Sequence, residues 1–124
     1  MIFLDTHIVV WLYAGLTGKL SARAVKMIEQ HELYIANIVK LELQYLYEIG
    51  RLTETPDIIL ADLRQTIGLK VHSVKMKSVF DTALMQTWTR DVFDRLITSE
   101  AIERDVFFIT KDKKILANYI KAAW

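Results

Sequence analysis

Five carboxylic acids of this chain stand where an isolated acid would be a poor structural choice. They are Asp5, Glu42, Asp91, Asp94 and Asp112. Asp5 closes an apolar run that starts at Ile2, and Asp112 comes shortly after the apolar residues 106–109. Burying a charge without a partner is very costly, so acids at such positions need compensation. Carboxylate oxygens are preferred ligands of Mg²⁺ and Mn²⁺, and a fold that gathers these acids would bind a hard divalent cation.

Such a cluster suits chemistry at phosphorus. Two divalent ions about 3.5 to 4 Å apart stabilise both the attacking and the leaving oxygen of an in-line displacement at a phosphate. Cations nearby could hold a phosphate backbone on either side and make binding sensitive to salt. The candidates for this role are Arg90, Arg95, Lys40 and Lys111. Lys113 and Lys114 fit better as solvated charges of a helix.

Each acid, taken alone, also has a structural interpretation. The spacing of Asp91 and Asp94 suits an N-cap and an acid at the third position of a helix. Asp112 stands at an expected strand-to-helix turn, and Asp5 could satisfy free amides of the helix that follows it. For any single acid the structural role is the stronger interpretation. The joint pattern is what favours a site.

The composition indicates one compact domain, which we expect to span residues 1–124. Hydrophobic residues make up 52% of the chain, with one proline and four glycines, which is enough for a full core. The formal net charge is +1, so any site for a polyanion must be built locally. The chain has no cysteine, which excludes disulfides and thiolate zinc sites and fits a reducing compartment.

The apolar stretch 8–14 is the only candidate for an export or membrane segment near the N-terminus. It is much shorter than the roughly 20 residues that span a bilayer. A secretory signal would also carry a basic segment before the apolar stretch, and none is present. We therefore expect a buried helix here, no membrane partner, and a cytoplasmic protein.

Short apolar strands alternate with helices along the chain. The expected strands are residues 2–5, 33–36, 70–74 and 106–109, and the tail 119–124 could add a last short strand. The expected helices are residues 6–14, 21–31, 38–49, 56–67, 76–87, 92–104 and a short segment from 111. Three residues mark helix boundaries: Ser21 as a cap, Pro56 in a first turn, and Gly68 after a last turn.

This alternation predicts an α/β fold. Its sheet should have four to five mainly parallel strands and helices on both faces. In sheets of this kind, ligands bind beyond the carboxyl ends of the strands. Asp5 and Asp112 both follow such ends, so we expect them at the same edge of the sheet.

Two helices should present further acids to that edge. In residues 38–49, Glu42 falls inside an apolar stripe at three- and four-residue spacing. The stripe consists of Ile38, Leu41, Tyr45 and Ile49. Glu42 then needs a partner, which could be the site or a buried arginine such as Arg95. In residues 92–104, Asp94 stands at the edge of a face expected to be buried, formed by Phe93, Ile97 and Ala101.

Four segments resemble the PIN-domain ribonucleases and, within them, the VapC-type toxins of bacterial toxin–antitoxin systems. They are Ile2-Phe3-Leu4-Asp5-Thr6-His7, the helix segment 41–51, the stretch 88–97 with Arg-Asp-Val-Phe-Asp-Arg, and Ile109-Thr110-Lys111-Asp112. Each segment alone is a weak signal. Together they cover essentially the whole chain in order and spacing, which makes the resemblance specific.

The resemblance implies a three-layer α/β/α sandwich with an acidic quartet that binds Mg²⁺ or Mn²⁺. The quartet is Asp5, Glu42, Asp94 and Asp112. Asp91 looks like the supporting acid of the subgroup that carries this arginine-rich stretch. Two residues match hydroxyl positions beside the metal-binding acids: Thr6 and Thr110. The chain departs from the subgroup at Val92, where proline is usual, so the orientation of the Asp91 carboxylate is less fixed.

The implied activity is metal-dependent endoribonuclease cleavage. Metal-activated water would hydrolyse an RNA phosphodiester and leave a 5′-phosphate and a 3′-hydroxyl. Related toxins form homodimers, and a cognate antitoxin silences them by laying a segment into a groove near the site. We therefore expect an RNA substrate, an antitoxin partner and a homodimer.

Other functions fit less well or stay open. A phospho-acceptor receiver domain would need an acid pair at the first strand and an aspartate ending the third, but residues 70–74 contain no acid. Phosphate-loop nucleotide chemistry would need a Gly-Lys-Ser/Thr motif, which is absent. A catalytically silent PIN-type binding module stays open, although no acid is missing. A metal-dependent DNA nuclease also stays open, although the chain lacks a strand-threading insertion.

Two of the expected helices carry more apolar side chains than one core face needs. These are Trp11, Leu12, Tyr13, Leu43, Leu46 and Tyr47. They could form a groove for a partner helix, or they could pack the core or a homodimer. The sequence does not decide between these uses.

Overall fold

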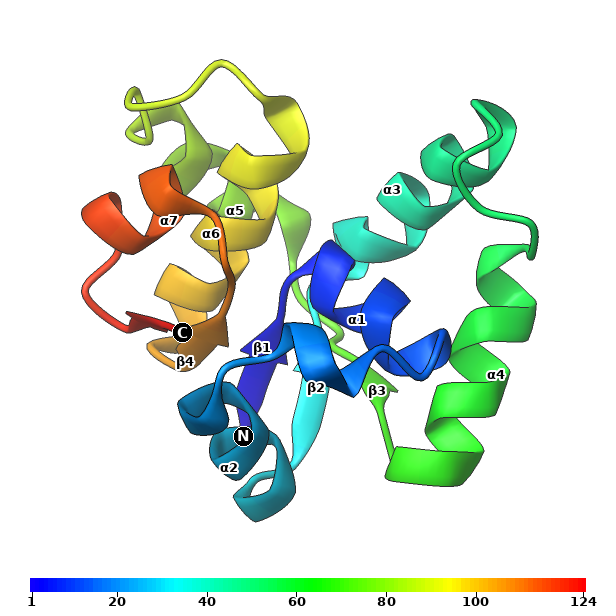
Figure 1. Cartoon of the computed structure of the whole chain (residues 1–124). Coiled ribbons are helices and arrows are strands. Elements are labelled where there is room, and N and C mark those ends of the chain that lie inside the picture. Colours follow the sequence, from blue (N-terminus) through cyan, green and yellow to red (C-terminus); the bar gives the residue numbers. More distant parts are fainter.

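A sheet of five parallel strands organises the molecule (Figure 1). The computed structural model describes all 124 residues. The strands are β1 (Ile2–Leu4), β2 (Leu33–Ile35), β3 (Lys70–Val71), β4 (Phe107–Ile109) and β5 (Ala122–Ala123), in the order β3-β2-β1-β4-β5. Every pair of neighbours runs parallel. Parallel neighbours cannot be joined by a tight turn, so helical crossovers connect them.

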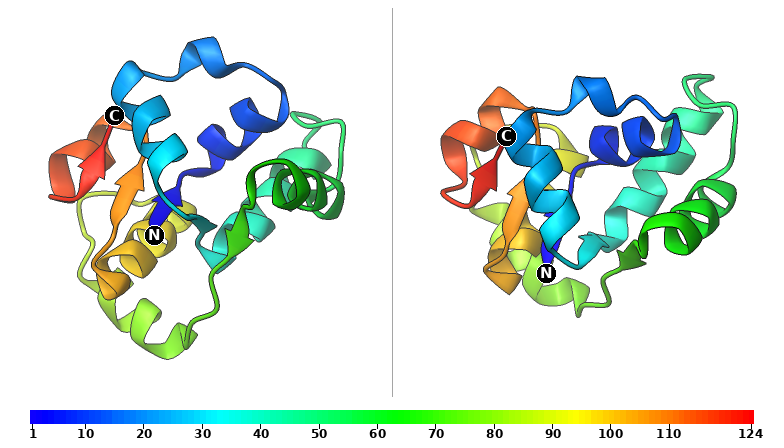
Figure 2. Two further views of the ribbon diagram at one scale, coloured as in Figure 1. Left: turned by 90° about the horizontal axis from the view of Figure 1, so that it is seen from below. Right: turned by 60° about the horizontal axis from the view of Figure 1, so that its bottom comes forward.

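Helices cover both faces of this sheet. They are α1 (Thr6–Tyr13), the 3₁₀ turn η1 (Thr17–Lys19), α2 (Ala22–Gln30), α3 (Asn37–Glu48), α4 (Pro56–Ile67), α5 (Met76–Leu84), α6 (Val92–Arg104) and α7 (Lys113–Asn118). In the left view of Figure 2, α1 and α2 lie on one side of the strands, and α5 and α6 lie on the other. The predicted three-layer α/β/α fold is therefore confirmed. None of the helices is long and apolar enough to cross a membrane.

The core is centred on β1, the middle strand. All three of its residues are completely buried, because helices pack on both faces of the sheet. A continuous cluster of 21 buried residues joins the strands to the inner faces of the helices. Asp5 follows directly on this strand, so the chain places a carboxylate at the edge of the sheet straight after a fully buried strand.

Three helix boundaries follow local sequence signals. The Ser21 hydroxyl accepts a hydrogen bond from the Ala24 N–H at 3.0 Å and caps α2. Pro56 is the first residue of α4, where its fixed φ suits a helix start. Gly68 ends α4 with φ +71°, a left-handed conformation that glycine adopts without steric cost. All three boundaries agree with the sequence prediction.

The strand β3 is shorter than predicted. It pairs with β2 only at Lys70–Val71, whereas the sequence indicated residues 70–74. After Val71 the His72 side chain turns into the core, and its Nδ1 lies 2.8 Å from Oε1 of Glu100 on α6. The His72 backbone N–H still donates a hydrogen bond of 2.9 Å to the Ile35 carbonyl of β2, and no residue after His72 pairs with that strand.

The helix α5 also ends earlier than predicted, at Leu84 rather than at 87. Its last carbonyl groups are occupied by Arg95 of α6. The guanidinium donates hydrogen bonds of 3.1 and 2.9 Å to the Ala83 carbonyl and one of 3.4 Å to the Leu84 carbonyl. A cation is favourable at this negative end of a helix. Arg95 therefore does not pair with Glu42, as the sequence had allowed.

The predicted buried stripe of α3 is wrong. The fully buried residues of α3 are Val39 and Leu43, which face the helices α1, α4 and α6 that contact it. Three members of the predicted stripe are exposed: Leu41, Tyr45 and Ile49. Glu42 therefore lies not inside an apolar stripe but beside Leu43, at the edge of the buried face.

Candidate active site

Asp5 begins α1 at the carboxyl end of β1. Its Oδ1 accepts a hydrogen bond of 2.7 Å from the Thr6 backbone N–H, and its Oδ2 accepts one of 2.6 Å from the Thr110 hydroxyl. Only 8% of Asp5 is exposed. Burial raises the pKa of Asp5, and the hydrogen bonds from Thr110 and Thr6 oppose that rise. These contacts hold the carboxylate in one orientation at the sheet edge.

Asp112 lies next to Asp5, across the Thr110 side chain. Its backbone N–H donates a hydrogen bond of 3.0 Å to the same Thr110 hydroxyl that binds Asp5. Its Oδ1 caps α7 by accepting hydrogen bonds from the N–H groups of Lys114 (2.8 Å) and Ile115 (3.0 Å). Both hydrogen bonds use one oxygen, so Oδ2 stays free for a ligand.

Asp91 and Asp94 share the first turn of α6. Asp91 is the N-cap, and its Oδ1 accepts a hydrogen bond of 2.9 Å from the Asp94 N–H. The Asp91 N–H in turn donates to the Thr89 hydroxyl at 3.1 Å. The helix begins at Val92, so the missing proline does not displace its start. Again only one carboxylate oxygen of the cap is occupied.

Glu42 is half-buried on α3. Burial raises the pKa of Glu42, the Thr6 side chain opposes this rise, and Asp5 adds to it. The Thr6 hydroxyl is buried and makes no hydrogen bond of normal geometry, so its effect on Glu42 is one of proximity. Thr6 and Glu42 are thus neighbours in the same site.

The five acids converge at one edge of the sheet. The clearest sign is Asp94, whose pKa is raised to about 7 by burial and then by the negative charges of the four other acids. Carboxylates repel one another in this way only when they are close. The structure therefore brings together the five acids that the sequence singled out.

A hard divalent cation would suit these acids, because every donor is a carboxylate oxygen. Their present side-chain conformations do not form a ready cage, since no three acids or histidines lie close enough together to hold a metal ion. The free oxygens of Asp91 and Asp112 leave room for adjustment. The carboxylate donors fit the ion, and their side chains would have to move closer together to bind it.

The predicted phosphate-binding arginines lie near α6. Arg90 donates a hydrogen bond of 2.8 Å from its Nη1 to the Thr87 carbonyl. Arg95, as described, binds the end of α5 and is partly buried. Both guanidinium groups thus have backbone partners in the protein, and Arg95 is the more firmly engaged.

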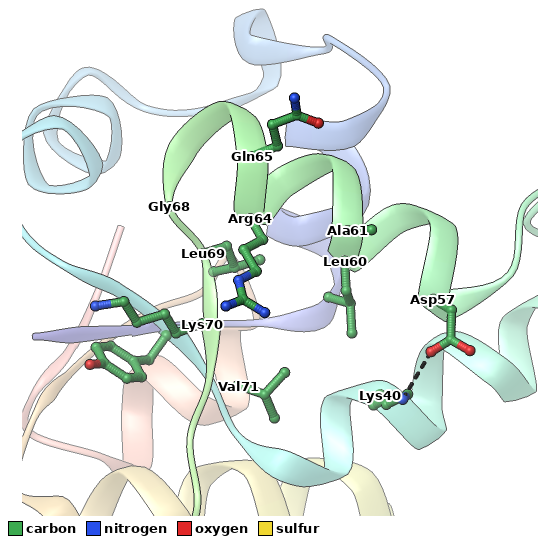
Figure 3. Close-up of a pocket in the computed structure, with 11 residues that line it drawn as sticks. Lys40, Asp57, Leu60, Ala61, Arg64, Gln65, Gly68, Leu69, Lys70 and Val71 are labelled. Atoms are coloured by element: carbon green, nitrogen blue, oxygen red, sulfur yellow. Dashed lines mark ion pairs between the residues drawn. The ribbon is translucent and has the colours of Figure 1, made fainter.

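Lys40 does not join the acids. It precedes Glu42 by two residues on α3, which places it on nearly the opposite side of the helix. Its ammonium lies 2.9 Å from Oδ1 of Asp57, on the wall of a pocket of about 920 Å³ beside α4 and β3 (Figure 3). None of the five acids lines this pocket. Lys111, by contrast, directly precedes Asp112 and stays at the site.

The sequence interpretation missed a buried acid outside the site. Glu100 of α6 is completely buried. Its Oε1 pairs with His72, and its Oε2 accepts a hydrogen bond of 3.0 Å from the Asn37 N–H at the start of α3. Burial raises the pKa of Glu100, and its hydrogen bonds with His72 and Asn37 oppose that rise. Its position three residues after Ile97 on a predicted buried face was the available signal.

His7 is a second residue to which the sequence assigned no role. It is exposed on the first turn of α1. Although burial raises the pKa of both Asp5 and Glu42, His7 is close enough to both to oppose the rise. Its place in the opening Asp5-Thr6-His7 segment was the only sequence signal.

Comparison with known families identifies the family of the chain. The profile of the PIN domain matches residues 2–121. The chain belongs to the PIN-domain family. A curated relative, Ribonuclease VapC22 of Mycobacterium tuberculosis (strain ATCC 25618 / H37Rv), is 32% identical over 120 residues, which cover 92% of this chain and 88% of the relative. The resemblance stated from the sequence is therefore confirmed.

Solved structures share the PIN fold. A VapBC2 complex from Rickettsia felis, bound to a promoter DNA fragment, matches with a TM-score of 0.66 and 23% identity over 94% of this chain and 92% of that one. A toxin–antitoxin complex from Klebsiella pneumoniae matches with a TM-score of 0.65 and 15% identity over 100% of this chain and 97% of that one. At these identities the matches show the fold alone.

Proposed function

We propose that this PIN-domain protein is a metal-dependent endoribonuclease and the toxin of a toxin–antitoxin pair. The observation that carries the proposal is the convergence of five acids at the carboxyl edge of the sheet, where Asp5 and Asp112 share the Thr110 hydroxyl and the charges of the other four acids add to the raised pKa of Asp94. The relative named Ribonuclease VapC22 supports the choice of RNA as substrate. The proposed reaction forms a bond from a water oxygen to phosphorus and breaks the phosphorus bond to the 3′-oxygen, which takes up a proton.

Four acids would hold Mg²⁺ or Mn²⁺: Asp5, Glu42, Asp94 and Asp112. The bound ion would supply positive charge that offsets the phosphate and lowers the pKa of the attacking water. The other residues keep these acids in place. Thr110 orients Asp5 and the chain before Asp112, and Asp91 fixes the first turn of α6, which carries Asp94.

The decisive experiment is cleavage of a mixed small-RNA pool by the purified protein, with EDTA or with Mg²⁺ or Mn²⁺. We expect cutting only with metal. Asp5→Asn and Asp94→Asn should each lower the rate by on the order of 10²-fold or more, while circular dichroism shows an intact fold. Asp62→Asn is the matched control, because Asp62 is an exposed acid of α4, and it should cut like the wild type.

Other outcomes would favour other functions. Full activity in a purified Asp5→Asn or Asp94→Asn protein would refute the metal-site assignment. A folded wild-type protein, freed of any co-purifying partner, that cuts no RNA would favour a silent PIN-type binding module. Cutting of single-stranded DNA but not of RNA would favour a DNA nuclease.

The proposal includes protein partners, an antitoxin and a second copy of the chain. Exposed apolar side chains support such partners. On and just after α5, Leu84 and Met85 are 71% and 76% exposed, and Phe80 is exposed one turn earlier. We assign this α5 face to the homodimer. The exposed residues of α3 beside the acids then remain for the antitoxin.

A further inference from the structure

Two tryptophans form a surface feature close to the acids. Trp11 lies on α1, and Trp124 is the last residue after β5. Their rings meet edge to face, with centroids 6.1 Å apart and an angle of 63° between the ring planes. Both are partly exposed while they also pack against the core. Figure 2 shows the C-terminal end beside the segment that joins α1 to α2.

Two lysines rest on these rings. The Lys19 ammonium lies 5.5 Å from the centroid of Trp11, and the Lys111 ammonium lies 5.9 Å from that of Trp11 and 6.0 Å from that of Trp124. Neither lysine forms an ion pair with a carboxylate. Their charges are met only by ring faces and solvent. We call Trp11, Trp124, Lys19 and Lys111 the tryptophan platform.

The tryptophan platform is continuous with the acidic site. Lys111 directly precedes Asp112. His7 lies one helical turn before Trp11 on the same side of α1, with 6.5 Å between the ring centroids. His7 is also the residue that approaches both Asp5 and Glu42. A flexible chain that crosses the platform would therefore pass directly to the acids.

Resting on the proposed ribonuclease function, we propose that the tryptophan platform binds one unpaired nucleotide of the RNA next to the cleaved phosphate. The base stacks on an indole face, and the two lysines bind the phosphates beside it. Each lysine is exposed and carries its ammonium on a four-carbon stem with several rotatable bonds, so the ammonium moves from the ring to a phosphate as the base takes its place. The ammonium then contacts the full negative charge of a phosphate in place of the ring face.

The alternation of groups favours single-stranded RNA over an acidic protein segment. An unpaired RNA strand presents flat bases and phosphates in turn, and the platform offers indole faces and ammonium groups in turn. An acidic peptide would satisfy the lysines but would leave the indole faces without a flat partner. A duplex keeps its bases stacked inside and cannot offer them to the rings.

Tryptophan fluorescence can test the proposal directly. The chain has three tryptophans, so Trp88→Phe leaves Trp11 and Trp124 as the reporters. This protein is titrated in EDTA with a fluorescein-labelled, single-stranded RNA octamer, and anisotropy and tryptophan emission are recorded together. We expect emission to be quenched in step with binding. Poly-glutamate, the probe for an acidic protein segment, should quench far less.

A charge-matched pair of variants separates the platform from general attraction. Lys19→Gln with Lys111→Gln should weaken RNA binding by about tenfold. Lys113→Gln with Lys114→Gln removes the same charge from exposed lysines of α7, and it should change binding by no more than about twofold. Equal weakening in both double variants would overturn the proposal.

The remaining outcomes test the platform and the ribonuclease function separately. RNA that binds without changing the emission would overturn the platform, and poly-glutamate that quenches as strongly as RNA would assign the surface to a protein partner. Cleavage in Mg²⁺ by the same preparation, without quenching, would leave the ribonuclease function standing and remove the platform. Quenching with the lysine effect but without cleavage would support the platform and reject the ribonuclease. Failure to bind any RNA in EDTA would reject the platform, while the cleavage assay in Mg²⁺ decides the ribonuclease function separately.

Discussion

Asp5, Asp91 and Asp112 each begin a helix while they also contribute to the candidate active site. Capping and ligand binding are therefore not competing roles here. A carboxylate at a helix N-terminus accepts free backbone N–H groups and is stabilised by the positive end of the helix dipole. The helices pack on the sheet, so each cap fixes its carboxylate relative to the others.

Thr110 predicts a stability effect at this site. Thr110→Val removes the donor to Asp5 and the acceptor for the Asp112 N–H. Unsatisfied polar groups in a buried place should lower the free energy of unfolding by about 1–3 kcal/mol, measured by urea denaturation without metal. Thr110→Ser keeps the hydroxyl and should lose much less. A loss in Thr110→Ser as large as that in Thr110→Val would contradict a dominant role for the hydroxyl.

Asp94 predicts a pH dependence of stability in the metal-free protein. Burial and the neighbouring acids raise its pKa from 3.8 to about 7. Between these values the folded protein keeps a proton that the unfolded chain has released. Stability must then fall as pH rises through this range. We expect the midpoint of thermal unfolding in EDTA to be higher at pH 5 than at pH 8.

The matching variants identify the group responsible. Asp94→Asn removes the titrating carboxylate and should flatten the profile between pH 5 and pH 8. Asp62→Asn should keep the wild-type profile. A wild-type midpoint that rises from pH 5 to pH 8 would contradict the assigned direction.

At the scale of elements, the sequence predicts what local chemistry decides. The strands β1 and β4 are short apolar runs, and the boundaries at Ser21, Pro56 and Gly68 depend on neighbouring residues only. The edge occupied by Asp5 and Asp112 follows from the direction of parallel strands. These parts of the fold and of the site can therefore be predicted from the sequence.

Contacts between distant segments decide what the sequence could not predict. The burial of His72 just after β3 depends on its partner Glu100, which lies 28 residues later. The end of α5 depends on Arg95, which reaches back to carbonyl groups 11 and 12 residues earlier. The buried face of α3 depends on which helices pack against it. A periodic pattern carries none of this information.

Glu100 predicts the cost of losing one such contact. Glu100→Ala leaves the His72 ring and the Asn37 N–H without their partner. We expect a loss of about 3–5 kcal/mol in the free energy of unfolding, measured in urea. Glu100→Gln keeps the size and a carbonyl oxygen and should lose less. A Glu100→Ala protein as stable as the wild type would show that the contact is dispensable.

At the scale of the whole molecule, a nearly neutral chain divides its charge unevenly. It has 16 basic and 15 acidic residues. Five acids meet at the site, so the ten that remain leave the rest of the molecule at a formal +6. Such a surface attracts a polyanion, while the site repels it until a cation is bound. The net charge of +1 does not report this uneven distribution of charge.

The α5 face predicts the oligomeric state. Leu84→Lys places a charge on an exposed apolar face, so it should shift the protein from dimer to monomer in light scattering. Ile120→Lys is the control, because Ile120 is also highly exposed but lies outside α5. It should leave the dimer intact. A Leu84→Lys protein that remains dimeric would move the interface to another face.

The helix caps have a genetic consequence. Asparagine caps a helix about as well as aspartate, and their codons differ by one nucleotide. At Asp112, one of the four proposed metal-binding acids, both capping hydrogen bonds use one oxygen, and asparagine retains such an oxygen. Under the proposed function, a single nucleotide change could thus abolish the activity of the encoded protein while the cell still makes it in a folded form. Such an inactive copy would still occupy the antitoxin and so release active copies from its control.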